Sequence, residues 1–167
     1  MIKINGQTAK KLLIQLEADK RKVLDNERSS RTYSFLNGEE PFVPEYDFAA
    51  VQEQLADIGE KEVKIRHARN QFNAATVLDG IGLTIDAAIV RQAQLKDEIM
   101  RLGNMRTIPQ KTRNMPMGAK ASEYTCRNFD LEPVEAAYQA AVAEQAALHE
   151  AIDRANVTEI FEVDIDL

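Results

Sequence analysis

The chain has 167 residues, and its 21 basic and 27 acidic side chains give a formal charge of −6. This length is typical of one domain, and no apolar run reaches the roughly 18 residues that a membrane-spanning helix needs. The one cysteine, Cys126, cannot form an internal disulfide, and the first residues lack the apolar core of a signal peptide. We therefore expect a cytoplasmic protein.

The composition favours long helices. Alanine is abundant, tryptophan is absent, and aromatic residues make up 6% of the chain. Alanine is the best helix former but buries little surface. We predict a mainly α fold over residues 1–167, a single helical domain. It would consist of long antiparallel helices of bundle or coiled-coil type, with a small β component.

The chain begins with a strand pattern and a helix pattern. Lys3 lies between two isoleucines, and this alternation predicts a strand over residues 1–5. Gly6 breaks the pattern. Thr8 is a suitable N-cap for a helix that reaches about residue 26 or 28.

Residues 29–46 change character. Tyr33 and Phe35 alternate with polar residues, and Asn37-Gly38 is a strong signal for a hairpin turn. Two prolines follow, so a returning strand would be short and at an edge. We predict a β-hairpin or ordered arm between two helices, and we expect it to be an exchanged or interlocking element.

Asp47 is a suitable N-cap for the longest helix, to about residue 73. Its apolar residues alternate at spacings of three and four, as in a coiled coil. Glu62 and Arg69 interrupt this stripe. We interpret the stripe as a candidate seam between chains, formed by Phe48, Val51, Leu55, Ile58, Ile65 and Phe72.

A third helix is predicted after a connection that contains Asp79-Gly80. Thr84 would cap it, and Asp86 would lie favourably near its positive end. Gly103 is placed as the residue just beyond its last turn. Residues 103–121 show no periodicity and predict a long loop, a type of segment that is usually functional or mobile.

The last third of the chain predicts a strand, a helix and a second strand. Residues 122–129 form the first strand. Asp130 would cap a helix to about residue 156. Residues 160–167 alternate strictly and predict the second strand. Its partner is either the first strand, which Lys3 facing the acidic side favours, or the matching tail of another chain.

No catalytic or metal-binding motif is present, so we expect no cofactor and no metal. His149 and Asp153 share a helix face, but two ligands do not make a metal site. A solvated helix face explains them better. Cys126 has no histidine near it in the sequence, and a small buried hydrophobic residue is the favoured interpretation.

The segment 101–127 carries six basic residues and one acid, a net charge of +5. A flexible basic loop could bind a phosphate backbone, a nucleotide or an acidic partner. The other interpretation, which we favour, is a loop that pairs with acidic helices of its own or a neighbouring chain. The candidate phosphate or nucleic-acid contacts are Arg106, Lys111, Arg113 and Lys120.

Several stretches resemble a family of small bacterial helical proteins of unknown function, some of which carry the label septicolysin. They are NGEEP at residues 37–41, KIRHARNQFNAAT at 64–76, LDG at 78–80 and LTIDAAI at 83–89. The match is good over residues 37–102. Asn70 and Asn73 stand where the family has paired asparagines. The resemblance implies a mostly helical oligomer and brings no activity.

The narrow apolar stripes bury limited area in one chain, so we expect a homo-oligomer, a dimer or an assembly of dimers. The leading hypothesis is a non-enzymatic bacterial scaffold or interaction protein. The alternative is nucleic-acid or phosphate binding through the basic loop. An enzyme is less favoured than either.

Overall fold

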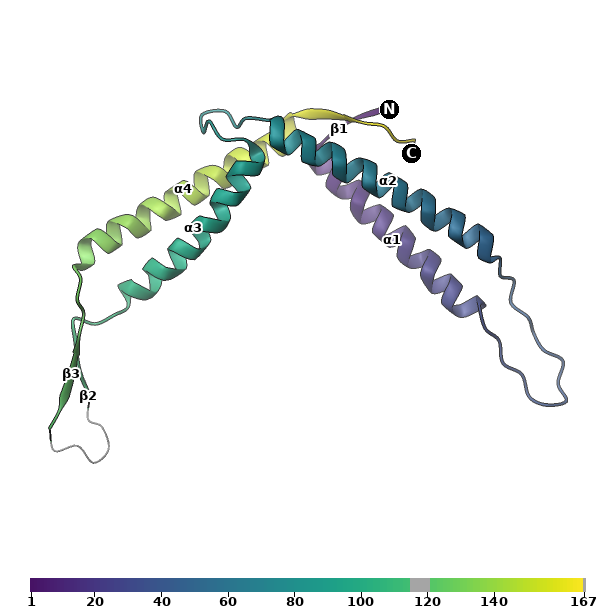
Figure 1. The fold of residues 1–167 in the computed structure, drawn as a ribbon, viewed down its shortest axis with the longest axis horizontal. Coiled ribbons are helices and arrows are strands. Elements are labelled where there is room, and N and C mark those ends of the chain that lie inside the picture. The colour runs from purple at the N-terminus through teal and green to yellow at the C-terminus, as the bar shows by residue number, and fades with distance from the viewer. Residues whose placement is uncertain (115–120, 167) are drawn as a thin grey trace. The chain divides into compact units, whose positions relative to one another are not determined.

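A computed structural model describes residues 1–114 and 121–166 (Figure 1). The mainly α fold with a small β component is confirmed. In the described residues, the elements in chain order are β1 (Ile2–Asn5), α1 (Gly6–Ser30), α2 (Phe48–Ala75), α3 (Ile85–Arg106), β2 (Lys111–Asn114), β3 (Glu123–Cys126), α4 (Leu131–Thr158) and β4 (Ile160–Val163).

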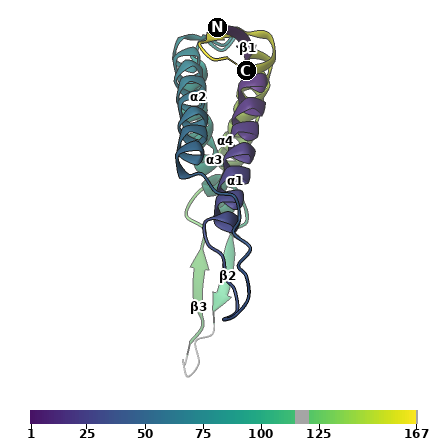
Figure 2. The ribbon, with the colours of Figure 1, turned by 90° about the vertical axis from the view of Figure 1, so that its right-hand side faces the viewer.

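The chain divides into two compact units. The first unit contains Met1–Thr76 and Arg154–Leu167, and the second contains Val77–Asp153. In the first unit α1 and α2 lie side by side, with β1 and β4 at one end (Figures 1 and 2). The second unit is built from α3, the two-stranded sheet β2–β3 and most of α4. That residues 1–167 behave as a single domain stays a prediction.

The two terminal strands pair with each other. β1 and β4 are antiparallel, with Lys3 opposite Glu162 and Ile4 opposite Phe161. Lys3 Nζ lies 3.6 Å from Glu162 Oε1, so the basic residue does face the acidic side of the tail. Pairing within the chain is thus the alternative that the structure shows.

The core of the first unit lies between this sheet and the helices. Val163 and Ile165 from the tail are buried, together with Ile4 and Ala9 from the start of the chain. Ile65 of α2 completes the cluster. Burial of such side chains contributes about 1.5–3 kcal/mol each. The alternation therefore places Phe161, Val163 and Ile165 on the inner face, as the sequence predicts. The strand itself is shorter than predicted and ends at Val163, and Leu167 lies outside the described residues.

Asn5, rather than Thr8, caps α1. Its side-chain Oδ1 accepts a hydrogen bond from the Thr8 N–H at 2.9 Å, and its Nδ2 donates to the Val157 carbonyl at 2.9 Å. The first bond satisfies an unpaired donor of the helix N-terminus. The second joins the start of α1 to the last turn of α4, so one side chain holds two helix ends together.

The caps predicted for the next two helices are confirmed. Asp47 accepts from the Ala49 and Ala50 N–H groups, and Thr84 accepts from the Ala87 N–H. α2 extends to Ala75, two residues beyond the predicted end. α4 begins directly after Asp130, with Pro133 in its first turn.

Two predictions about the connections are wrong. Gly103 does not follow α3 but lies inside it, because the helix continues to Arg106. Part of the predicted loop 103–121 is strand β2, which pairs with β3. Of the two alternatives for residues 29–46, the β-hairpin is not formed and the arm is: α1 runs to Ser30, and the segment that follows has no regular structure apart from a turn at Asn37-Gly38. A hairpin would need the second half of this segment to pair with the first half. The two prolines in the second half cannot donate backbone hydrogen bonds to such a pair.

Buried positions on the helices recur every seven residues. They are Ile58, Ile65 and Phe72 on α2, Ala88, Leu95 and Leu102 on α3, and Val134, Ala141 and Leu148 on α4. A helix that packs against one partner buries one narrow stripe, and its other faces stay in water.

Two helical glycines predict opposite effects of an added methyl group. A Cβ at Gly6 would overlap the side chain of Asn156, whereas a Cβ at Gly59 would meet nothing within 4 Å. Gly59→Ala should stabilise the protein by about 0.5–1 kcal/mol, because glycine is a poor helix former. Gly6→Ala should destabilise it by about 1–3 kcal/mol through overpacking. Thermal unfolding followed by circular dichroism measures both, and equal effects of the two changes would contradict the close approach at Gly6.

Candidate interaction surfaces

The segment between α1 and α2, residues 31–47, is called the arm below. It holds six large apolar or aromatic side chains, and all of them are exposed; Phe42 is 86% exposed. The members are Tyr33, Phe35, Leu36, Phe42, Val43 and Tyr46. Single exposed apolar residues are normal, whereas a concentration of them in one short segment is a common feature of interaction sites.

The arm has local order. The Glu39 N–H donates to the Leu36 carbonyl at 3.0 Å, and Gly38 has a φ of +95°, which glycine adopts readily. The rings of Tyr33 and Phe35 stack with centroids 6.3 Å apart. These contacts order the first half of the arm and hold two of its aromatic rings together.

Tyr46 anchors the end of the arm to α1. Its hydroxyl donates to Glu27 Oε1 at 2.9 Å. Partial desolvation and the neighbouring Glu27 carboxylate raise the pKa of Tyr46 above its ordinary value. This contact orders the segment where it enters α2.

The arm is acidic as well as apolar. It contains Glu39, Glu40, Glu45 and Asp47 against Arg31, a net charge of −3. Asp47 is occupied as a helix cap. The three glutamates make no ion pair within the residues that the structure describes, so their carboxylates are available to a basic partner.

The predicted seam on α2 is divided by the structure. Ile58, Ile65 and Phe72 are buried within the first unit, and the Phe72 ring stacks on Phe161 with centroids 4.7 Å apart. Phe48 is exposed, while Val51 and Leu55 are half-buried. The open part of the stripe therefore adjoins the arm.

The basic candidates are placed in the second unit. Arg106, at the end of α3, makes a two-pronged ion pair with Glu135 of α4, and its guanidinium lies 4.0 Å from the centre of the Tyr138 ring. Arg127, from the same basic segment, donates to the Phe129 and Ile108 carbonyls. Much of the local positive charge is thus engaged within the unit.

Lys111 and Arg113 lie on β2. The Lys111 ammonium lies 4.1 Å from the centre of the Tyr124 ring, and Arg113 Nε donates to Ser122 Oγ at 2.8 Å. Neither has a carboxylate partner among the residues described. Lys120, the fourth candidate, lies outside the described residues.

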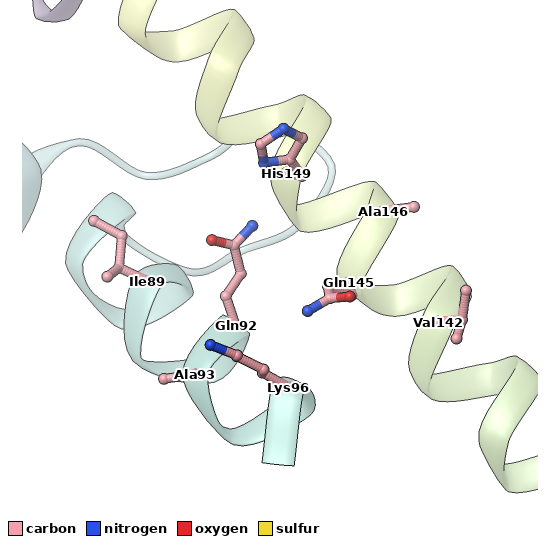
Figure 3. Close-up of a pocket in the computed structure, with 8 residues that line it drawn as sticks. All are labelled: Ile89, Gln92, Ala93, Lys96, Val142, Gln145, Ala146 and His149. Carbon is pink, nitrogen blue, oxygen red and sulfur yellow. The ribbon is translucent and has the colours of Figure 1, made fainter. Parts of the chain in front are cut away.

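A shallow groove runs between α3 and α4 (Figure 3). Small and apolar side chains line much of it, with Lys96 and His149 as its ionisable residues. Gln92 projects from α3 and Gln145 from α4 toward the space between the helices. Shallow walls and few converging polar groups suit contact with a protein surface more than a small molecule.

Residues of chemical interest do not converge. Cys126 is exposed, so its interpretation as a buried hydrophobic residue is wrong. Its strand belongs to the two-stranded ribbon β2–β3, and all four residues of that strand are exposed. His149 Nε2 lies 3.4 Å from exposed Asp153, at the predicted helical spacing. In the described ranges no three of His, Cys, Asp and Glu are grouped as a metal site, and no helix is long and apolar enough to cross a membrane.

Two arginine–glutamate pairs join α3 to α4. Arg91 donates to both carboxylate oxygens of Glu144 at 2.7 Å. The Arg106–Glu135 pair lies at the C-terminal end of α3 and near the N-terminal end of α4. Hydrogen bonds from these arginines lower the pKa of both glutamates. Sequence reasoning missed these pairs because their partners are 53 and 29 residues apart.

Comparison with known proteins supports the fold and gives no function. No family model and no curated protein matches the chain. The chain is similar to the crystal structure of a functionally unknown conserved protein from Corynebacterium diphtheriae, with a TM-score of 0.62 and 12% identity. The match covers 96% of this chain and 100% of that one. It is consistent with a bacterial family of unknown function, while the label septicolysin gains no support.

The ion pair at Glu135 predicts a pH-dependent stability. A carboxyl whose native pKa is lowered contributes stability above its unfolded pKa, and that contribution is lost as the pH falls through the native pKa. Glu135→Gln should therefore lower the melting temperature at pH 7, and the gap from the unmodified protein should close in acid. Thermal melts from pH 7 to pH 3 measure this, with Glu53→Gln on the exposed face of α2 as the control. A gap that persists at pH 3 would mean that the carboxylate charge is not its source.

Proposed function

We propose that the protein is a non-enzymatic, homo-oligomeric scaffold or interaction protein of the bacterial cytoplasm that associates through its arm. The single observation that carries this proposal is the group of six exposed apolar side chains on residues 31–47. Because water contact with such side chains is unfavourable, covering them gives a strong driving force for association. Phe48, Val51 and Leu55 extend the same apolar surface onto α2.

The exposed area of the chain supports association. The chain exposes 12349 Å² of accessible surface. A compact protein of 18.8 kDa exposes about 8,300 Å², and two separate compact bodies of half that mass expose about 10,000 Å² together. The exposed area of the chain exceeds both values. Together the two units bury less of their surface than compact bodies of the same mass would.

Nucleic-acid or phosphate binding is supported less well. Arg106 is neutralised by Glu135, and Arg127 is used on backbone carbonyls. A phosphate backbone would have to compete for these groups.

The acidic arm also makes an anionic membrane an unfavourable target for its aromatic side chains, since membrane-surface segments usually carry basic residues.

Light scattering on a size-exclusion column tests the proposal, at low and high salt, with the 260/280 nm absorbance read on the same peak. The expected result is a salt-resistant multiple of 18.8 kDa without excess absorbance at 260 nm. A monomer at all concentrations would contradict it. Nucleic acid that salt strips from the peak would also contradict it and favour the basic segment, because phosphate contacts weaken steeply with salt.

The double variant Phe35→Ser/Phe42→Ser tests the role of the arm. A buried phenylalanine contributes about 1.5–3 kcal/mol, so the variant should weaken association by at least about 100-fold. Helix content should not change, because both side chains are exposed in the chain itself. Val63→Ser is the matched control, an exposed apolar residue of α2 outside the arm. Equal effects of the two variants would contradict a specific role of the arm.

A further inference from the structure

We propose that the arm of one chain docks on the β2–β3 ribbon of a second copy of the same chain. This inference rests on the proposed function and names the surface that the arm covers. It joins two elements that the structure leaves uncovered, one acidic and aromatic, the other basic and aromatic.

The ribbon has two chemically different faces. Strand register places Arg113 opposite Tyr124 and Lys111 opposite Cys126. Since alternate residues of a strand point to the same side, these four residues share one face. The other face carries Thr112, Asn114, Glu123 and Thr125, and Asn114 Nδ2 donates to Thr125 Oγ1 there. One face is therefore basic with an aromatic ring, and the other is largely uncharged.

The described residues of the ribbon are largely exposed. All four residues of β3 and three of the four residues of β2 are exposed, and Tyr124 is 51% exposed. An isolated two-stranded ribbon is at best marginally stable in water and needs a third strand or a packed face. Both outer edges also leave backbone groups free to accept another strand.

The arm has the properties that the ribbon lacks. Glu39, Glu40 and Glu45 match Lys111 and Arg113 in charge, and aromatic side chains of the arm match Tyr124. The arm has no helix or strand of its own, which leaves it able to lie along a strand edge. Charge complementarity of this kind sets register and suppresses wrong partners, while apolar contact supplies most of the affinity.

A second copy is the occupant because one sequence supplies both halves of the contact. If the arm of each chain docks on the ribbon of the other, two equivalent contacts form in a closed dimer. Such a reciprocal arrangement covers both arms and both ribbons at once. It needs no other molecule to explain why the two exposed elements are opposite in charge.

Charge reversal in a mixing experiment tests this contact. Variant A carries Glu39→Lys and Glu40→Lys in the arm, and variant B carries Lys111→Glu and Arg113→Glu on the ribbon. Each alone should associate at least tenfold more weakly, because its arm and ribbon carry like charges. Mixed in equal amounts, A and B should form heterodimers at near-native affinity, since each arm then meets a ribbon of opposite charge. Native mass spectrometry distinguishes the two chains by mass.

Lys10→Glu/Lys11→Glu on the exposed face of α1 is the control for altered net charge, and circular dichroism checks that every variant is folded. If the unmodified protein is oligomeric and A and B both remain so, the arm–ribbon contact is wrong, while the proposed function stands. If A and B each lose association but do not form heterodimers, the contact is also overturned. If the unmodified protein is monomeric, the proposed function itself fails.

Discussion

The structure depends on one geometric constraint: a helix that packs against a single partner can bury one narrow stripe. In both units a set of buried helix positions recurs every seven residues, as at Ile58, Ile65 and Phe72. Alanine at several stripe positions permits close approach but removes little apolar area from water. Long helices built in this way are well formed and yet leave large faces, connections and strand edges in solvent.

Each unit has further contacts that add to the limited burial between its helices. In the first unit the paired termini add a layer over α2, and Asn5 fixes the start of α1 to the last turn of α4 through its two hydrogen bonds. In the second unit two arginine–glutamate pairs join α3 to α4. These pairs are partly exposed, so their contribution is modest and sensitive to salt. Neither device covers the arm or the ribbon, which is why association is the physical outcome that we propose.

Local signals in the sequence predicted the local structure well. Asp47 and Thr84 predicted two helix starts, and strict alternation with Lys3 predicted both terminal strands and their pairing. These features depend on residues that are near in sequence or on one repeating pattern. Gly103 was misleading because glycine is frequent after helix ends, whereas here the hydrogen-bond ladder continues past it to Arg106. Strand β2 has the sequence KTRN, which contains no apolar alternation from which a strand could be predicted.

The candidate site could be predicted only in part. The arm was identified from its composition, but its lack of strand pairing depends on how its two halves approach in space. The basic residues were recognised as a group, whereas the engagement of Arg106 by Glu135 requires α3 and α4 to be placed side by side. The two faces of the ribbon follow from the strand register, which no sequence pattern in this segment fixes.

Amide hydrogen exchange of residues 31–47, measured by mass spectrometry over a range of protein concentrations, tests the central claim most directly. If a second chain covers the arm, its amides should be protected at high concentration and exchange rapidly on dilution. The segment around Ile65, buried within the chain, should not change. Rapid exchange of the arm at every concentration would contradict the claim that it is the surface through which the protein associates.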